Sequence, residues 1–124
     1  MLLNNLYTID QISESEMTIH AKVSLKAEHD IFKGHFPGHP VLPGVCMLEM
    51  IKEICSSFLQ QHFRISGASI IKFLQMIDPN RDSFIEFEIT YAPDLTKMLT
   101  KGKIYSGTRV FMKFELILSS SKND

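Results

Sequence analysis

The segment that most constrains this chain is a stretch rich in proline and glycine that leads directly into an apolar helix. Residues 35–44 read His-Phe-Pro-Gly-His-Pro-Val-Leu-Pro-Gly and contain three prolines and two glycines. Proline fixes φ and has no backbone N–H to donate, so this stretch is expected to form a stiff loop. Proline is also favoured at a helix start, and apolar residues recur at helical spacing from Val45 to about His62. The sequence therefore predicts a rigid loop that presents His35 just before the N-terminus of a long helix.

Most of the remaining chain has the alternating pattern of half-buried β-strands. Apolar and polar residues alternate in segments 17–26, 83–91 and 109–119. Segment 98–105 is interrupted by Gly102, and segment 68–77 is apolar on both faces, as expected of a central strand. Gly67 is expected to end the crossing from the helix, and residues 78–82 to form a tight turn.

A single helix has to be covered by a single sheet, which fixes the fold class. We expect an α+β protein of the hot-dog fold, in which a curved antiparallel sheet of about five to six strands wraps around one long central helix. The whole chain, residues 1–124, is expected to be one domain. The strand at 109–119 has no proline to block an open edge, so we expect at least a homodimer.

The composition excludes several classes of partner. Thirteen basic and fourteen acidic residues give a formal net charge of −1, which leaves no concentrated basic face for nucleic acid. The first residues lack the basic region of a signal peptide, and no apolar run approaches the roughly 20 residues that span a bilayer. We expect a cytoplasmic protein without membrane contact. Cys46 and Cys55 point apart on the predicted helix and are expected to be free thiols.

The segment from His35 to Glu49 resembles the active-site segment of the 3-hydroxyacyl-[acyl carrier protein] dehydratases. The pattern of that family is H-F-P-x-x-P-V-x-P-G-V-x-x-x-E, and every fixed position is filled here. A weaker similarity follows downstream, where Lys72-Phe73, Pro79 and Asp82 are similar to the K-F strand and P-G-D turn of the family.

The resemblance implies a hydro-lyase that needs no cofactor and converts a (3R)-hydroxyacyl thioester to the trans-2-enoyl thioester. The thioester would be carried by acyl carrier protein, in fatty acid or related polyene and polyketide biosynthesis. His35 would be the base, and Glu49, which the neighbouring subunit contributes in the family, would protonate the leaving hydroxyl or orient a water. The residues expected to bind substrate are Phe36, Pro37, Val41, Pro43 and Val45.

A further catalytic candidate follows from helix geometry. The first N–H groups of a helix have no intrahelical partner and lie at the positive end of the helix dipole. Gly44, which has no side chain, would let a thioester oxygen approach these groups. Gly44, with Val45 beside it, is therefore the candidate oxyanion donor.

The sequence departs from the family directly after Glu49, where Met-Ile-Lys-Glu replaces the usual Ala-Met-Ala-Gln. Either the Glu53 carboxylate repels Glu49, or Lys52 neutralises Glu53. Two alternative functions stay open: an acyl-thioester hydrolase on the same fold, and a non-catalytic acyl-binding or partner subunit of a hetero-oligomeric dehydratase. No metal site is expected, because prolines keep His35 and His39 out of a helical arrangement. A basic rim for the acidic carrier would draw on Lys33, Lys72, Lys101, Lys103 and Arg109.

Overall fold

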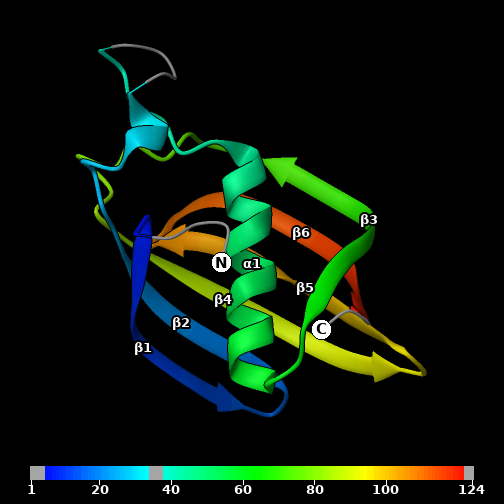
Figure 1. The fold of residues 1–124 in the computed structure, drawn as a ribbon. Helices are drawn as coiled ribbons and strands as arrows, with labels where there is room; N and C mark the ends of the chain where they lie inside the picture. Colours follow the sequence, from blue (N-terminus) through cyan, green and yellow to red (C-terminus); the bar gives the residue numbers. More distant parts are fainter. Residues whose placement is uncertain (1–4, 34–37, 122–124) are drawn as a thin grey trace.

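The chain folds as a curved sheet around one α-helix, as a computed structural model shows for residues 5–33 and 38–121 (Figure 1). The helix α1 is Gly44–Leu59, and a short 3-10 helix, η1, covers Asp30–Phe32. The six strands are β1 (Tyr7–Ser15), β2 (Thr18–Leu25), β3 (Phe63–Phe73), β4 (Phe84–Asp94), β5 (Lys97–Ser106) and β6 (Arg109–Ser120). They form one antiparallel sheet in the order β1-β2-β4-β5-β6-β3. The predicted α+β hot-dog architecture is confirmed.

The helix starts and ends where backbone geometry changes. Pro43 precedes it in an extended conformation, and its carbonyl accepts hydrogen bonds from the Cys46 and Met47 amides in the first turn. Gln60 ends it by adopting the left-handed conformation, with φ 54°, and donates its N–H to the Ser56 carbonyl. The helix therefore ends slightly before His62, where the sequence predicted its end. Gly67 was expected to end the connection that follows the helix, but it lies inside β3.

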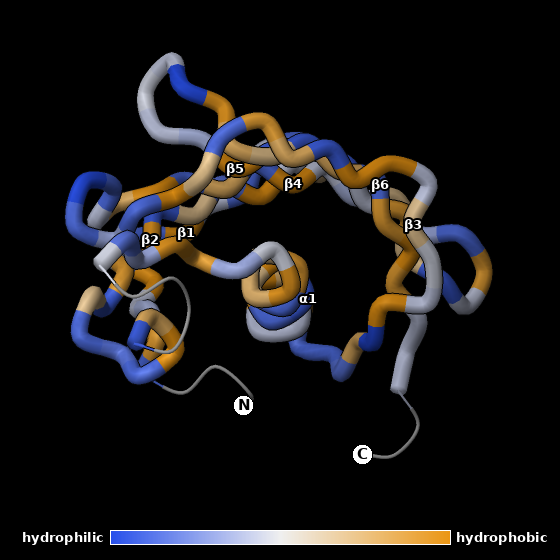
Figure 2. Tube along the Cα trace, turned by 90° about the horizontal axis from the view of Figure 1, so that it is seen from above, coloured by the Kyte–Doolittle hydropathy of each residue, from blue (hydrophilic) through white to orange (hydrophobic). Residues whose placement is uncertain are grey.

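The core lies between α1 and the concave face of the sheet, which curves over the helix in Figure 2. The predicted strand faces are confirmed on β4, where Ile85, Phe87 and Ile89 are fully buried and alternate with partly exposed residues. From α1, Met50, Ile51 and Ile54 fill the centre of this core. Val45, expected on the apolar side of the helix, is instead 74% exposed.

The position of β3 differs from the prediction. Segment 68–77 was expected to be a central strand, but β3 ends at Phe73 and lies at one edge of the sheet, beside β6. Its apolar residues on both faces remain partly exposed, with Ile70 42%, Ile71 39% and Phe73 52% accessible. The prediction of an open edge at 109–119 is wrong, because β6 lies between β5 and β3. The two edge strands of the sheet are β1 and β3.

The loop between β3 and β4 is fixed to both the sheet and the entrance of the helix. Residues 79–81 make the predicted turn, and Asp82 is buried at its end. The Asp82 carboxylate accepts hydrogen bonds from Arg81 and from Arg109, the first residue of β6. Upstream, the Leu42 N–H donates to the Ile77 carbonyl at 2.9 Å, which ties the segment before α1 to this loop. Within the described ranges, no helix is long and apolar enough to cross a membrane.

Candidate active site

The predicted site residues lie around the N-terminal half of α1, as far as the structure describes them. His35, Phe36 and Pro37 fall outside the described residues, so their predicted roles stay predictions. Of the remaining candidates, Val41 and Gly44 line a depression beside the start of the helix, and Glu49 lines another further along it. Pro43 and Val45 line neither of these two depressions.

The first turn of α1 leaves two amides available. The Cys46 and Met47 N–H groups donate to the Pro43 carbonyl, with N–O distances of 3.0 and 3.2 Å. The Gly44 and Val45 N–H groups have no acceptor within residues 5–33 and 38–121. These are the two amides that the sequence suggested for a thioester oxyanion, and their position at the helix start suits that role.

A neighbouring aromatic ring accounts for the glycine at position 44. A Cβ built on Gly44 would lie 2.7 Å from Cζ and 2.9 Å from Cε1 of Phe73. The ring of Phe73 thus occupies the space that a side chain would need, which is a packing reason for glycine beside the expected catalytic one. The two residues border an apolar depression of about 390 Å³, lined also by Val41, Leu42, Met47, Leu74 and Met76. The exposed Val45 side chain does not line this depression, and its predicted contact with substrate stays a prediction.

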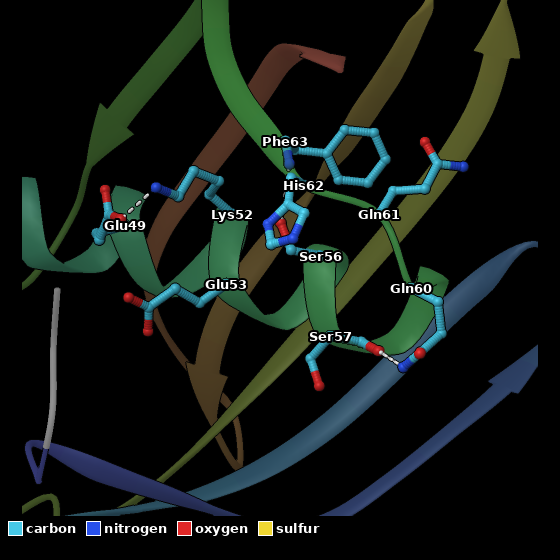
Figure 3. A pocket seen from close by; sticks show the side chains of 9 residues that line it. All are labelled: Glu49, Lys52, Glu53, Ser56, Ser57, Gln60, Gln61, His62 and Phe63. Carbon is cyan, nitrogen blue, oxygen red and sulfur yellow. Dashed lines mark hydrogen bonds and ion pairs between the residues drawn. The ribbon is translucent and has the colours of Figure 1, made fainter. Parts of the chain in front are cut away.

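Glu49 lines the second depression, a polar pocket of about 490 Å³ along α1 (Figure 3). Its carboxylate forms an ion pair through Oε2 with Nζ of Lys52, three residues further along the helix. The Glu49 and Lys52 side chains are only 20% and 22% exposed. Glu49 is therefore not the solvated surface charge that its place in a polar stripe would suggest.

Glu53 lies one turn beyond Glu49 and is buried, with 6% of its surface exposed. Its Oε1 accepts a hydrogen bond of 2.8 Å from the Tyr7 hydroxyl on β1, and its Oε2 is buried with no hydrogen-bond partner in the described part of the chain. Of the two alternatives for this stretch, the one in which Lys52 pairs with Glu53 is not found, because Lys52 pairs with Glu49. Nothing in the sequence indicated Tyr7, because its contact with Glu53 joins residues of β1 and α1 that are far apart along the chain.

Burial and these two carboxylates also raise the pKa of nearby ionisable groups. Burial, the hydrogen bond to Glu53 and the charges of Glu53 and Glu49 raise the pKa of Tyr7, so its hydroxyl remains a donor. Burial, and then the charges of Glu49 and Glu53, raise the pKa of the Cys46 thiol despite its place at a helix start. Cys46 and Cys55 are both free and buried. Among the residues that the structure describes, no cluster of histidine, cysteine and carboxylate side chains could hold a metal ion.

The basic residues considered for a carrier-binding rim do not form one patch beside this pocket. On β5, Lys101 and Lys103 alternate with the buried Thr100 and Ile104, so they lie on the outer face of the sheet. Lys72 of β3 belongs to the same outer face, where it lines a groove together with them. Arg109 is bound to Asp82.

Fold and pocket together define a hot-dog protein that carries a shielded glutamate on its central helix. Residues 11–107 match the family model of ApeI-like proteins, described as ApeI dehydratase. This match covers most of the chain, and the chain belongs to the ApeI-like dehydratase family.

Curated relatives support the resemblance seen in the motif. A 3-hydroxyacyl-[acyl-carrier-protein] dehydratase FabZ of Lactococcus lactis is 35% identical over 89 residues, which cover 66% of this chain and 58% of that protein. The FabZ of Campylobacter fetus is 25% identical over 111 residues, covering 88% of this chain and 66% of the relative. The chain thus matches about half to two thirds of the length of these relatives.

Solved structures show the same fold at low sequence identity. The dehydratase heterocomplex ApeI:P from Xenorhabdus doucetiae contains a chain with a TM-score of 0.72 and 17% identity, over 90% of this chain and 96% of that one. A putative thioesterase from Lactococcus lactis has a TM-score of 0.67 and 9% identity, over 100% and 98% of the two chains. Since dehydratases and thioesterases share this architecture, the site has to decide the chemistry.

Proposed function

We propose that this protein removes water from (3R)-hydroxyacyl thioesters to give trans-2-enoyl thioesters. The observation that carries the proposal is Glu49, which occupies the motif position of a dehydratase family and lies in a shielded pocket on α1. The FabZ relatives are named for substrates on acyl carrier protein, and we assign the same carrier here, in fatty acid or related polyene and polyketide assembly.

Each part of the reaction has a candidate group. His35 takes the proton from C2 of the acyl chain, and the electron pair left behind forms the C2=C3 double bond as the C3–O bond breaks. The leaving hydroxyl takes a proton either from Glu49 in its acid form or from a water that the Glu49 carboxylate orients, and it departs as water; the proton that His35 took from C2 then restores the proton donor. Negative charge that develops on the thioester oxygen is stabilised by the Gly44 and Val45 amides, which have no acceptor among the residues that the structure describes, and one such donor contributes about 2.7–4 kcal/mol in comparable sites. The step is redox-neutral and requires no cofactor.

The decisive experiment follows hydration of a trans-2-enoyl thioester by loss of enoyl absorbance. Wild type, His35→Ala and Glu49→Gln are compared on acyl carrier protein and coenzyme A thioesters. We expect wild-type turnover and a loss of about 10²-fold or more in each variant, because each removes an acid–base group. Retained secondary structure by circular dichroism shows that the variants fold. Release of free thiol without hydration would instead identify a thioester hydrolase, and no turnover on either carrier would favour a non-catalytic subunit.

We also propose that a second hot-dog chain pairs with the β3 edge. This edge carries partly exposed apolar residues on both faces, which an isolated subunit would leave in water. A second copy of this chain is the expected partner, and the resemblance requires it to supply Glu49 to the neighbouring site. Light scattering at micromolar concentration should give a dimer mass, and Ile70→Lys should weaken the dimer. A wild-type monomer would reject the homodimer and make a different dehydratase-like subunit, as in the Xenorhabdus heterocomplex, the partner to test.

A further inference from the structure

The ion pair between Lys52 and Glu49 is unusual for its shielding from solvent. The two residues lie three positions apart on α1, a spacing that places side chains next to each other on a helix. Lys33 and Asp30 have the same spacing, but their side chains are 72% and 90% exposed, against 22% and 20% for Lys52 and Glu49. Exposed pairs of this kind contribute little and are screened by salt, whereas a shielded pair keeps its geometry and its charge interaction.

Two contacts direct the Lys52 ammonium to Glu49 although Glu53 is its immediate neighbour in sequence. Tyr7 reaches across from β1 and donates its hydroxyl to Oε1 of Glu53. Lys52, by contrast, contacts Oε2 of Glu49, and the two side chains lie side by side in Figure 3. Each carboxylate on this face of α1 therefore has its own partner: an ion pair with Lys52 of the helix for Glu49, and a hydrogen bond from Tyr7 of the sheet for Glu53.

The pairing leaves the two oxygens of Glu49 in different surroundings. Oε2 is buried and contacts the Lys52 ammonium, whereas Oε1 is not among the buried oxygens; neither accepts a regular hydrogen bond from the residues that the structure describes. Oε1 is thus the oxygen that can meet a ligand in the pocket. A carboxylate held through one oxygen by a fixed cation has fewer orientations to lose when the other oxygen binds substrate.

We propose that Lys52 is a positioning residue for Glu49. This inference rests on the proposed dehydratase function. Lys52 holds the carboxylate so that Oε1 faces the C3 hydroxyl of the acyl chain or the water that protonates it. Lys52 touches Glu49 and need not touch the substrate itself.

The first test compares Lys52→Met, Lys52→Arg and Lys22→Met in the hydration assay with an enoyl thioester. Lys22 lies exposed on β2 and serves as the matched control for loss of one lysine. We expect Lys52→Met to lower kcat about tenfold or more, with KM changed much less, because the Glu49 carboxylate loses the cation that holds its orientation in the transition state. Lys52→Arg keeps the charge and should recover most of kcat, and Lys22→Met should behave as wild type. If Lys52→Met does not fold, Lys52→Gln takes its place.

A double-mutant cycle shows whether Lys52 acts through Glu49. In the Glu49→Gln background the further change Lys52→Met should alter kcat less than about twofold, because the carboxylate that Lys52 positions is already gone. A purely structural role would instead lower kcat by the same factor in both backgrounds. Equal factors, or a Lys52→Met enzyme within twofold of wild type, would overturn the inference while the dehydratase proposal stands. Absence of turnover in wild type would overturn both.

Discussion

The buried carboxylate of Asp82 allows a quantitative test of how the loop before β4 is held. Its side chain is 2% exposed and accepts hydrogen bonds from Arg81 Nη2 at 3.0 Å, from Arg109 Nη2 at 2.5 Å and from the Asp78 N–H at 3.2 Å. Asp82→Asn keeps the shape but removes the charge that these donors face. Breaking a fully buried pair costs about 3–5 kcal/mol. Since the Arg81 and Arg109 side chains are 57% and 39% exposed, we expect a loss of about 2–3 kcal/mol.

The assay is urea unfolding at a fixed protein concentration, because the stability of an oligomer depends on concentration. Asp30→Asn is the matched control, since Asp30 also pairs with a cation but is 90% exposed, and it should change stability by less than about 0.5 kcal/mol. A loss below about 1 kcal/mol for Asp82→Asn would refute the argument that this carboxylate fastens the loop to β6.

The same variant should also change how stability depends on pH. Burial alone would raise the pKa of Asp82, but the hydrogen bonds from Arg81, Arg109 and the Asp78 amide outweigh burial and hold the pKa below its ordinary value. The ionised carboxylate therefore stabilises the fold fully above the unfolded pKa of about 3.9, and this stabilisation is lost as the pH falls through the folded pKa. The difference between wild type and Asp82→Asn should be constant from about pH 5 to 8 and should shrink below about pH 4.

Three further substitutions or reactions test the packing. A Cβ on Gly102 would lie 1.7 Å from the Glu88 carbonyl oxygen, so Gly102→Ala should force β4 and β5 apart. We expect the free energy of unfolding to fall by about 2 kcal/mol or more, and an unchanged melting temperature would contradict this close approach. Gly44→Ala should destabilise the start of α1, because its methyl group would meet the Phe73 ring at 2.7 Å. Phe73→Ala in the same chain should recover part of that loss, and no recovery would mean that another contact is responsible. Burial raises the pKa of the Cys55 thiol to about 12, so at pH 8 a thiol reagent should label Cys55 only as fast as the protein unfolds. Mass spectrometry of the labelled peptides measures this rate, and immediate modification of Cys55 would contradict the prediction.

Local patterns were sufficient to predict the architecture. The alternation around Phe87 and the helical spacing around Ile51 identified the buried faces, because burial of one side of an element imposes its period on the sequence. The proline-rich loop also indicated the helix start, since Pro43 does lie at its cap. Gly102 weakened the strand prediction for 98–105, but it lies within β5. A glycine is required at this position because the β4 backbone passes too close for any side chain.

The errors concern neighbours that are distant in sequence. An apolar residue such as Ile71 is typical both of a central strand and of an edge strand that pairs with another chain. The apolar pattern therefore could not predict the position of β3 in the sheet. Likewise Glu53 reads as part of a polar helix stripe, and only the fold brings Tyr7 from β1 over it. The Lys52–Glu49 pair is local and i,i+3 spacing permits it, but spacing alone could not choose between the two glutamates on either side of Lys52.

The strand order has a consequence for the way this chain is made in the cell. β3 follows directly after α1, yet its partner in the sheet is β6, with Phe63 opposite Ser120. A nascent chain therefore carries β3 with its apolar residues and backbone groups unpaired until residues 109–120 have been synthesised. Pairing of two strands that are so far apart in sequence is slow. While β3 remains unpaired, it can associate with other chains. A ribosome that stalled before residue 109 would release a product in which β3 and β5 both lack the strand that lies between them.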